Sequence, residues 1–579
     1  MRIVLFLLLM SGMYSSTLAQ RVAIDGHFAD WDSLSVLATD PVGDMGGSGA
    51  DFARLQADDD GEWLYFSFDT GIDMLIQEDN SLRLAIDTDA NPSTGTSMQG
   101  IGAEFVWNFG DRSGTVRLGS VSAQIQHNDV HLIPAPSMTT SRFEVAIRRD
   151  VMFSGQRMFP SDSMRISLSD TGGDRLPDAA GGILYNFRTT GIEPGIEHLI
   201  RTPEAGTVRL LSWNTLFNGL LDTERQPAYT RMLRGLKPDI MCFQECFDIE
   251  AADVLSFIQS ILQPPAGRIW RALKRDQGDI LVTHLDVESS WQLQSEYRES
   301  AYLLRTAADE PLLLLNCHFR CCTANEHRQK EADGVIRFLR DAKSPGGSVT
   351  VPQGTPFVLV GDLNLVGDRR QYQTLITGDI SNNAGYGADE APDWDGGPWT
   401  DLEARHPSSL FNFTWDDDES SYAPGKLDYI LYTASVLEVT QDMVVDPREI
   451  SAGQRIRLGI EEGDARIASD HLPRIADLRW KNSTAVEPVA ADSWSIGTLY
   501  PQPARGHVIV DVRTNRPFDL NVSLHDILGR AIALPNDALG HGTSDSQRHA
   551  IRLPELYPGI YILTISDGMK SEIRPVIVD

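Results

Sequence analysis

The stretch Phe357–Leu365 (FVLVGDLNL) constrains the fold more than any other part of the chain. Its first four residues are apolar, as in a buried β-strand, and Gly361 is followed by Asp362 and Asn364. Because side chains alternate along an extended backbone, this carboxylate and this amide lie on the same side. Carboxylates are seldom buried without a partner. The stretch therefore predicts a strand that ends in a polar site, and the alternative is a strand followed by an Asx-type turn.

Polar residues also mark five other predicted strand ends in the middle of the chain. In order they are Asn214, Glu245, His318, Asp428 and the pair Asp470–His471. Any one of them alone is more often a hydrogen-bonded structural residue than part of a site. With the GDLN stretch they form a series at domain-sized spacing, which favours one shared site. The amide of Asn214 and the carboxylate of Glu245 would make a partial shell for Mg²⁺, which usually keeps several waters.

A chain of 579 residues is too long for one hydrophobic core, so we expect several domains. We predict a signal peptide at 1–19, a β-sandwich at 20–200, an α/β domain at 206–480, a polar linker at 481–495 and a small β domain at 496–579. The expected fold class is therefore multidomain, with an all-β sandwich at each end and a layered α/β domain between them.

The first residues have the pattern of a secretory signal peptide. Met1-Arg2 supplies a positive charge, Ile3–Met10 is apolar, and Thr17-Leu18-Ala19 fits a small-x-small cleavage site. The alternative is a short membrane anchor, but the apolar segment is short for one. No internal apolar run is long enough to cross a bilayer. We therefore expect a secreted or cell-surface protein without a transmembrane segment.

The composition is acidic, with 50 Lys and Arg against 81 Asp and Glu and a net charge of −31. Such a charge argues against a protein that binds nucleic acid through a broad basic face. It does not exclude a nuclease, because a bound metal ion neutralises phosphate charge locally.

Region 20–200 has the pattern of an all-β module. Short alternating runs, separated by turn-rich segments, are typical of a sandwich and occur at Trp63–Phe68, Leu82–Ile86, Glu104–Trp107 and Phe143–Ile147.

Several turns of this region resemble the N-terminal parts of sandwich modules related to family 9 carbohydrate-binding domains. The matching segments are Ile24-Asp25-Gly26 with Asp30-Trp31, Asp58–Gly61 and Asp87–Gly95. The resemblance implies a glycan as a partner of this domain. The alternating oxygens of the DxDxN stretch in Asp87–Gly95 fit a structural Ca²⁺. The stretch lacks the downstream glutamate of an EF-hand, so a plain acidic turn remains the alternative.

Region 206–480 alternates apolar strands with amphipathic helices, as expected of an α/β domain. Helices are predicted at Gln226–Leu236, Ala251–Leu262 and about Asn325–Arg340, and strands at Val208–Trp213, Ile240–Gln244, Ile280–Thr283, Ala301–Arg305, Leu312–Asn316, from Phe357, and Leu427–Tyr432. Residues 381–426 are rich in Gly, Pro, Asp and Trp and are predicted to be a long surface loop, the usual place for substrate contacts.

The ordered series SWN, QE, H, GDLN, LDY and SDH resembles the endonuclease/exonuclease/phosphatase superfamily. This superfamily includes deoxyribonucleases, abasic-site endonucleases, neutral sphingomyelinases and inositol polyphosphate 5-phosphatases. The resemblance spans nearly all of 206–480. It implies a four-layered α/β sandwich, in which two β-sheets lie face to face with helices outside and the site lies at one end of the sheets.

The resemblance also implies how the metal is held and how water is handled. Asn214 and Glu245 are expected to bind Mg²⁺ or Mn²⁺, with Asp470 as a further ligand or an outer carboxylate. Asp362 is expected to orient or activate the attacking water, and Asn364 to hold this water or a phosphate oxygen.

Two histidines complete the implied site. His318 is expected to hydrogen-bond the phosphate, and Asp428 to pair with His471 and fix its tautomer. The sequence leaves open whether Asp362 or His471 is the general base.

The chain departs from its relatives at a few positions. Thr215 follows Asn214 where some abasic-site enzymes carry a second carboxylate, so metal binding is expected to rest mainly on Glu245. We expect His284, at the end of the run GDILVTH, to be structural. Arg320, His327 and Arg328 follow His318 and are within reach of a phosphate, but we predict that His327 and Arg328 lie on a solvated helix face.

Five cysteines fall in the middle third of the chain: Cys242, Cys246, Cys317, Cys321 and Cys322. Export permits disulfides, and the odd number leaves at least one thiol unpaired or joined to another chain. The spacings do not fit a structural zinc site. One hypothesis is a bridge from Cys246 to Cys321 or Cys322.

Three motifs stand out at the C-terminus: Leu499-Tyr500-Pro501-Gln502-Pro503-Ala504, Leu524-His525-Asp526-Ile527-Leu528-Gly529-Arg530 and the run from Leu556 to Leu563. In this order they resemble the sorting domain that directs cargo through the type IX secretion system of Bacteroidota-like bacteria. The resemblance implies the secretion machinery as a partner. The alternative is an ordinary β-sandwich of unknown role.

The sequence therefore favours a secreted, divalent-metal-dependent phosphohydrolase, and a phosphodiesterase more than a monoesterase. Its substrate is either nucleic acid or a phospholipid, as in sphingomyelinase or phospholipase C. Aromatic residues in the long loop would favour the lipid if they insert at an interface, or would merely anchor the loop: Trp394, Trp399, Phe411, Phe413 and Trp415. The alternative function is a non-catalytic surface protein whose sandwich binds glycan and whose hydrolase domain is degenerate.

Overall fold

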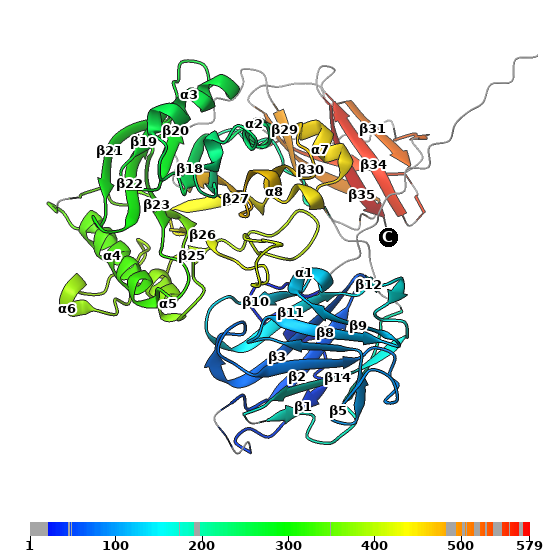
Figure 1. Cartoon of the computed structure of the whole chain (residues 1–579). Helices are drawn as coiled ribbons and strands as arrows, with labels where there is room; N and C mark the ends of the chain where they lie inside the picture. The colour runs from blue at the N-terminus through cyan, green and yellow to red at the C-terminus, as the bar shows by residue number, and fades with distance from the viewer. Residues whose placement is uncertain are drawn as a thin grey trace, which may run out of the picture. The chain divides into compact units, whose positions relative to one another are not determined.

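The computed structural model divides the chain into two compact units, Met1–Ser483 and Thr484–Asp579 (Figure 1). It describes residues 21–481 apart from 45, 46, 48, 173, 190–196 and 348, and in the second unit residues 494–500, 504, 506–514, 521–526, 530–535, 547–554, 556–557, 559–566 and 571–578. The predicted signal peptide at 1–19 and most of the predicted linker lie outside the described residues.

The N-terminal part is all β, as predicted. One sheet has the order β1-β2-β3-β11-β10, formed by Ala38–Thr39, Arg54–Asp59, Trp63–Met74, Thr140–Arg148 and Ile133–Ala135. The other has the order β15-β14-β4-β7-β8-β9 with β16 also paired to β14, formed by Arg175–Leu176, Ser163–Asp170, Leu82–Asp87, Phe105–Asn108, Ser113–Leu118, Val121–Ile125 and Ile183–Asn186. Apolar side chains of both sheets share one core, including Phe66, Leu84 and Phe105.

The sandwich has a few short elements besides these sheets. They are η1 at Trp31–Ser33, α1 at His127–Val130, the pair β5 and β6 at Thr96–Met98 and Ile101–Ala103, and the pair β12 and β13 at Met152–Phe153 and Gln156–Arg157.

The central part contains two six-stranded sheets. The first has the order β19-β20-β18-β17-β28-β27, formed by Arg271–Lys274, Ile280–Thr283, Ile240–Gln244, Val208–Asn214, Arg474–Trp480 and Leu437–Val444. The second has the order β21-β22-β23-β24-β26-β25, formed by Asp286–Gln292, Arg298–Arg305, Pro311–His318, Phe357–Asp362, Asp428–Tyr432 and Thr400–Asp401.

These sheets pack face to face with helices outside, which confirms the predicted four-layered fold (Figure 1). Leu210 and Ile240 of the first sheet share a buried core with Leu314 and Val358 of the second. The outer face of the first sheet packs against α2, α3 and α8, and that of the second against α4 and α5. The helices are α2 at Gln226–Leu236, α3 at Ala251–Ile261, α4 at Asn325–Lys343, α5 at Arg370–Thr377, α6 at Asn383–Tyr386, α7 at Ala452–Leu458 and α8 at Asp464–Ala468, with η2 at Gly219–Leu221 and η3 at Pro447–Glu449.

The predicted central elements agree closely with the observed ones. Helix α2 has the predicted bounds, because its buried face of Tyr229, Met232 and Leu236 has helical spacing and Lys237 then takes a left-handed conformation before Pro238. Residues 381–426 are mostly irregular, as predicted, and contain only α6 and β25.

Strand pairing brings the polar strand ends together. Strands β17 and β18 are parallel, with Asn214 beside Gln244, and β23 and β24 are parallel in the other sheet. The carboxyl ends of parallel neighbours meet at the same edge. Strand β26 runs antiparallel to β24, so that its first residue, Asp428, lies opposite Asp362. The fold thus gathers residues from distant parts of the chain at one end of the sheets.

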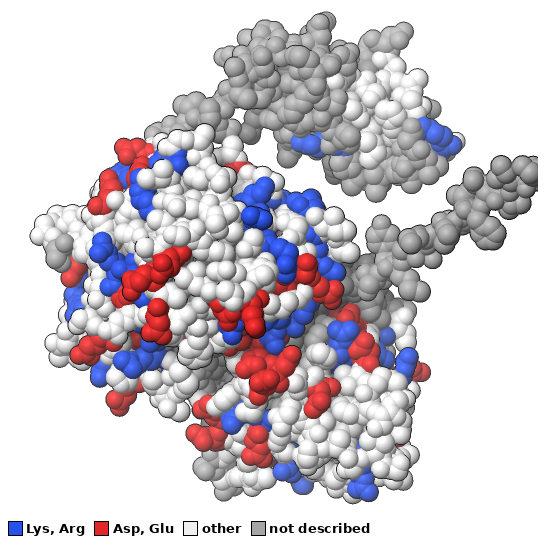
Figure 2. Space-filling view, turned by 45° about the horizontal axis from the view of Figure 1, so that its top comes forward, with Lys and Arg blue, Asp and Glu red and all other residues white. Residues whose placement is uncertain are grey.

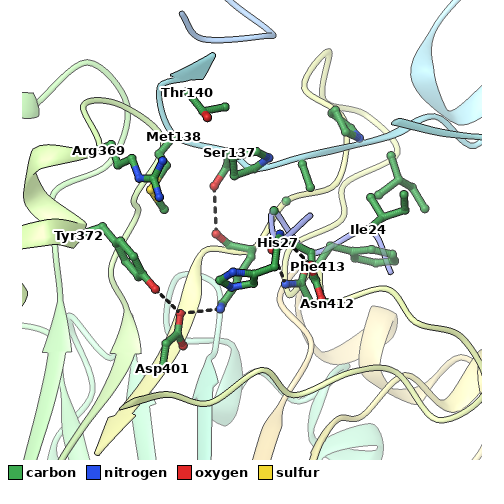
Figure 3. A pocket seen from close by; sticks show the side chains of 18 of the residues that line it. Ile24, His27, Ser137, Met138, Thr140, Arg369, Tyr372, Asp401, Asn412 and Phe413 are labelled. Atoms are coloured by element: carbon green, nitrogen blue, oxygen red, sulfur yellow. Dashed lines mark hydrogen bonds and ion pairs between the residues drawn. The ribbon is translucent and has the colours of Figure 1, made fainter. Parts of the chain in front are cut away.

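The sandwich packs on the long loop of the central domain within the first unit. Ile24 bridges to Phe411, and two ion pairs cross the contact: His27 to Glu403 at 2.9 Å, and Arg405 to Asp25 at 2.9 Å. A cavity of about 240 Å³ lies here (Figure 3). Its polar groups pair with one another, since Tyr372 and Lys426 both donate to Asp401. None of the predicted site residues is among its described lining residues.

The second unit is also all β. Its sheets have the orders β29-β30-β33 and β32-β31-β34-β35, formed by Trp494–Tyr500, His507–Thr514, Gln547–Arg552, Ala531–Ile532, Asn521–Asp526, Gly559–Ser566 and Ser571–Val578. Val508, Leu563 and Val576 belong to its core. Across the described residues of both units, no helix is long and apolar enough to span a membrane.

Candidate active site

A single amide joins two carboxylates at the end of the sheets. Asn214 Nδ2 lies 3.2 Å from Glu245 Oε1 and 3.0 Å from Asp362 Oδ2. Asn214 and Asp362 are buried, and Glu245 is half-buried. The three side chains come from the ends of β17, β18 and β24, so the structure brings together residues that the sequence places far apart.

The loop after β17 holds the carboxylate of Glu245 in place. Glu245 Oε2 accepts a hydrogen bond of 2.8 Å from the backbone nitrogen of Phe217. Leu216, Phe217 and Asn218 all have left-handed backbone conformations, with φ of 49°, 48° and 65°. Such a conformation costs a non-glycine residue roughly 1–2 kcal/mol. The fold thus accepts strain in a loop whose backbone holds Glu245 in place.

A histidine and an aspartate form a tight pair beside these carboxylates. His471 Nδ1 lies 2.7 Å from Asp428 Oδ2, and its Nε2 lies 3.8 Å from Asp362 Oδ2. Thr414 Oγ1 donates to the same oxygen of Asp428 at 2.7 Å. Burial alone lowers the pKa of His471, but the charges of Asp428 and Asp362 together raise it to about 10. The pair therefore holds His471 as an imidazolium whose Nε2 faces Asp362.

His318 also lies close to the carboxylate of Asp362, but its protonation state differs from that of His471. Its Nε2 is 3.6 Å from Asp362 Oδ2, and its Nδ1 is buried with no hydrogen-bond partner among the described residues. Burial, with the nearby charges of Arg298 and His471, lowers its pKa well below the ordinary value. His318 is thus a neutral imidazole with a nitrogen free for another group.

The backbone around Asp362 depends on a glycine. Gly361 has a φ of 134°, and a Cβ there would collide with the carbonyl oxygen of Cys317. Asp362 Oδ1 accepts from the backbone nitrogen of Asn364 at 3.0 Å, which is an Asx-type turn. Both outcomes considered for the GDLN stretch therefore hold at once: a turn is present, and it positions a carboxylate in a polar cluster.

Asp362 is held at a pKa near neutrality. Burial raises its pKa, His471 opposes the rise and the charge of Asp428 adds to it, so that the pKa is about 7. A bound cation would lower the pKa of Asp362 from this value, since a positive charge favours the carboxylate.

Asp470 takes its hydrogen bonds from residues other than the predicted ligands. Its Oδ2 accepts from Trp415 Nε1 at 2.9 Å and its Oδ1 from Ser469 Oγ at 3.3 Å. No hydrogen bond joins it to Asn214 or Glu245 among the described residues. Trp415 and Ser469 therefore fix the orientation of this carboxylate, and its charge acts on His471.

The donor set at the strand ends fits a hard divalent cation. The side-chain nitrogen Nδ2 of Asn214 donates to oxygens of Glu245 and Asp362, and its Oδ1 accepts a hydrogen bond of 3.0 Å from the backbone nitrogen of Leu216. The carboxylate oxygens are ligands of the kind Mg²⁺ and Mn²⁺ prefer, and Asn214 would bind such a cation through Oδ1. Among the described residues, this cluster does not bring three His, Cys, Asp or Glu ligand atoms within 4.8 Å of one another. A metal here would hence rely on few protein ligands, on the amide and on water.

Two residues near the site were missed from the sequence. Thr414, in the long loop, binds Asp428. Arg298, the first residue of β22, lies opposite His318 in the strand register. Neither belongs to a motif, and only the pairing of β22 with β23 reveals the position of Arg298.

One prediction about the residues after His318 is wrong. Arg328 is not solvated but fully buried, because its guanidinium donates to the carbonyl oxygens of Arg320 and Cys322 and to Asn325. His327 is exposed, as predicted. His284 bonds Asp239 at 2.7 Å away from the predicted site, which agrees with a structural role.

The hypothesis of a bridge from Cys246 to Cys321 or Cys322 is also wrong in this structure. All five cysteines are free. The thiol of Cys246 is buried against Thr215, whereas Cys321 and Cys322 are exposed. The thiols therefore belong to separate environments.

The aromatic residues of the long loop are anchors. Trp399, Phe411 and Phe413 are buried. The indole nitrogens of the half-buried Trp394 and Trp415 donate to Thr355 and Asp470. These side chains are not presented for insertion into a lipid surface, which removes the observation that favoured a lipid substrate.

Comparison with known families agrees with this fold. Residues 211–471 match the endonuclease/exonuclease/phosphatase family, and residues 498–579 match a secretion system C-terminal sorting domain. The central domain therefore belongs to the endonuclease/exonuclease/phosphatase family. The sorting domain identifies the chain as one destined for export or the cell surface.

Solved structures with similar folds span several activities. One is ANGEL2, a 2′,3′-cyclic phosphatase, in complex with adenosine-2′,3′-vanadate, with a TM-score of 0.34, 15% identity and coverage of 48% of this chain and 99% of that chain. Another is sphingomyelinase C from Streptomyces griseocarneus, with a TM-score of 0.27, 17% identity and coverage of 48% and 99%. A third is the AP endonuclease LMAP from Leishmania major, with a TM-score of 0.28, 14% identity and coverage of 47% and 88%. No curated protein matches the chain. Similarity this low does not identify a substrate.

Proposed function

We propose that the protein is a secreted, divalent-metal-dependent phosphohydrolase that cleaves phosphodiesters. The observation that carries this proposal is the meeting of Asn214, Glu245 and Asp362 with the Asp428–His471 pair at the end of the sheets. A carboxylate, an imidazolium and an amide around one buried space are the groups that attack of water on phosphorus requires.

The metal would be held by Asn214 and Glu245, which fit Mg²⁺ or Mn²⁺. When bound, it supplies positive charge that neutralises the phosphate and polarises its oxygens. Asp470 would then act as an outer carboxylate, since its side chain bonds Trp415.

The protein's own residues would handle the water and the phosphate. Asp362 orients the attacking water and takes up its proton, because the charge of His471 and a bound cation would hold it as a carboxylate that can accept one. Asn364, next to it, holds this water or a phosphate oxygen. His318, whose Nε2 faces Asp362, donates to the phosphate. His471, kept charged by Asp428, stabilises the negative charge that develops on phosphorus.

The proposal is tested with a generic diester, bis(p-nitrophenyl) phosphate. We expect hydrolysis with Mg²⁺ or Mn²⁺, loss of activity in EDTA and recovery when metal is returned. If turnover is absent, or if the wild type is no better than Asp362→Ala, the alternative of a non-catalytic surface protein is favoured.

The loop aromatics and the charges on one face of the protein bear on the class of substrate. The loop aromatics that would favour a lipid are anchored inside. Lys and Arg are interspersed with Asp and Glu on the face shown in Figure 2, which does not favour a long nucleic acid bound along a basic face. A panel of duplex DNA, RNA, sphingomyelin and phosphatidylinositol phosphates would separate the possibilities.

We also propose a structural Ca²⁺ in the sandwich, in a cluster formed by Asp87, Asp89 and Glu104 that we call the acidic loop. One ligand oxygen from each lies within 4.8 Å of the others. Glu104 is only 3% exposed, and its Oε1 is buried with no hydrogen-bond partner among the described residues. Burial raises the pKa of Asp87 and Glu104, so a bound cation would relieve the cost of their charges.

Export completes the proposal. The sorting domain supports passage through the secretion machinery, and the predicted signal peptide at 1–19 would provide the first step. The glycan expected from the resemblance of the N-terminal domain remains a prediction.

A further inference from the structure

Arg298 is a charged residue at the site whose donors are largely unused. It lies opposite His318 in the antiparallel register of β22 and β23. Its Nη2 donates one long hydrogen bond, 3.5 Å, to the backbone oxygen of Phe319, and its Nε is buried without a hydrogen-bond partner among the described residues. Among these residues no carboxylate forms an ion pair with it within 4.0 Å. A half-buried guanidinium is thus kept at the site without a direct counter-ion.

The few contacts of Arg298 tie it to the predicted catalytic groups. The carbonyl oxygen of Phe319 also accepts a hydrogen bond of 3.2 Å from Asn364 Nδ2, so Arg298 and Asn364 meet at one acceptor. The guanidinium carbon lies 5.7 Å from the centre of the Phe247 ring, which itself lies 6.3 Å from the His318 ring. Arg298 is therefore bounded by the groups expected to hold phosphate oxygens.

The surrounding fold makes room for Arg298 and offsets its charge. A Cβ on Gly278 would lie 2.6 Å from Cδ of Arg298, so any residue other than glycine would collide with the Arg298 side chain in this position. Asp276 and Asp279 are buried nearby, and neither oxygen of Asp279 has a hydrogen-bond partner among the described residues. Burial raises the pKa of both carboxyls, and the charge of Arg298 opposes this rise. The acids compensate the guanidinium at a distance and leave its donors available.

We propose that Arg298 binds the non-bridging oxygens of the scissile phosphate and stabilises the negative charge that grows on them during hydrolysis. This inference rests on the proposed function. The planar fork of a guanidinium matches two oxygens of a phosphate, and a fixed donor is worth most where charge develops in a site shielded from water. The oxygen of water forms the new P–O bond as its proton passes to Asp362, and the ester P–O bond breaks to release the alkoxide, which takes a proton from solvent, while Arg298 keeps its protons throughout.

A purely structural role would give Arg298 a different task. It would then only brace the Phe319 carbonyl and offset Asp276 and Asp279. Such a role predicts that removing the side chain lowers stability and leaves the affinity for phosphate unchanged.

The test compares Arg298→Ala and Arg298→Lys with a control, Arg275→Ala. Arg275 is exposed, donates to Ser290 and precedes Asp276 by one residue, so the control removes the same charge nearby. For each full-length protein we would measure kcat and KM on bis(p-nitrophenyl) phosphate with Mg²⁺, the affinity for inorganic phosphate by calorimetry, and the melting temperature.

We expect Arg298→Ala to lower kcat/KM by about 10²–10³ and to weaken phosphate binding at least tenfold, on the order found for one lost transition-state donor. Arg298→Lys should recover part of both, because it restores the charge without the fork. Guanidinium ion at millimolar concentration should partly rescue Arg298→Ala. Arg275→Ala should stay within about twofold of the wild type, as surface substitutions usually do.

Unchanged phosphate affinity in Arg298→Ala would overturn the inference, as would a loss of activity that follows a lowered melting temperature and is not rescued by guanidinium. Failure of the proposed function would look different. The wild type would then not hydrolyse the diester, and the phosphate titration would still decide whether Arg298 binds an oxyanion.

Discussion

The strand-end cluster of the central sheets and the acidic loop of the sandwich both gather buried carboxylates, but they surround them differently. At the sheets, Asp362 faces two imidazoles and an amide side chain. In the acidic loop, Asp87 and Glu104 face the backbone nitrogens of Asn91 and Thr88 and a third carboxylate.

This difference is the one expected between a site that catalyses a reaction and a site that binds a structural cation. Titratable histidine and aspartate side chains line the strand-end cluster. Backbone nitrogens, the hydroxyl of Thr94 and carboxylate oxygens line the acidic loop. Close backbone packing in the acidic loop also fits a cation-binding role, since a Cβ on Gly102 would lie 2.6 Å from the carbonyl oxygen of Asn91. We therefore expect substitutions at the sheets to change rates, and substitutions in the acidic loop to change stability.

The largest effect should come from His471→Gln. The variant keeps a polar side chain but cannot carry the positive charge that Asp428 sustains in the wild type. We expect kcat on bis(p-nitrophenyl) phosphate to fall by about 10²–10⁴ at temperatures where the variant is still folded, and the melting temperature to fall as well, because the buried Asp428 loses its counter-charge. The exposed His327→Gln serves as the control. A loss of less than threefold in His471→Gln would show that this end of the sheets is not the reacting site.

The next effect concerns the metal at the sheets. Glu245→Gln retains the hydrogen bond from Phe217 but removes a charge from the expected ligand set. The Mg²⁺ concentration for half-maximal activity should rise by about 10–100-fold, with activity partly restored at high Mg²⁺. Asp470→Asn should shift it less, because Asp470 bonds Trp415 and not the other ligands. Equal shifts in the two variants would contradict the assignment of Glu245 as the main ligand.

Stability should respond at the acidic loop. A ligand that binds only the folded state stabilises it by about 2.7 kcal/mol at a hundredfold excess over its Kd. Calorimetry of the whole chain should show a transition that Ca²⁺ raises in the wild type and not in Asp87→Asn. The exposed Asp111→Asn is the matched control in the same domain. Catalytic rates of Asp87→Asn should remain normal, and a calcium response that survives in it would refute the site.

A smaller effect is expected at Glu331, a buried carboxyl that belongs to neither region. Burial raises its pKa from 4.5 to about 7. The folded protein thus binds more protons than the unfolded chain between these values, so this group lowers stability progressively as the pH rises from about 4.5 to 7. Glu331→Gln lacks this loss and should be more stable than the wild type by on the order of 1 kcal/mol at pH 8, with no advantage near pH 4. Urea unfolding at both pH values measures the difference in free energy of unfolding between the variant and the wild type. An equal difference at both pH values would contradict the prediction.

The elements and the polar strand ends could be predicted because their signals are local. The apolar face of α2 and the runs before Asn214 and Asp362 are visible in a few consecutive residues. The same holds for the four-layered fold, because the order of the motifs matched that of a known family.

Contacts between distant segments could not be predicted. Arg298 reaches the site only through the pairing of β22 with β23. Arg328 is buried only because the loop before α4 and the side chains of Asn325 and Gln371 offer it acceptors. The direction of Asp470, turned to Trp415, likewise depends on how the long loop folds back. Such outcomes depend on tertiary packing, which hydrophobic periodicity does not encode.

The central claim is that the strand-end cluster hydrolyses phosphodiesters with a divalent metal. The most direct test is the turnover of bis(p-nitrophenyl) phosphate by the wild type and Asp362→Ala, each with Mg²⁺ and with EDTA. We predict turnover only for the wild type with Mg²⁺, lower by at least about 10³ in Asp362→Ala, as for loss of a catalytic group in concert with its partners. Equal rates in the two proteins, or a wild-type rate unaffected by EDTA, would contradict the claim.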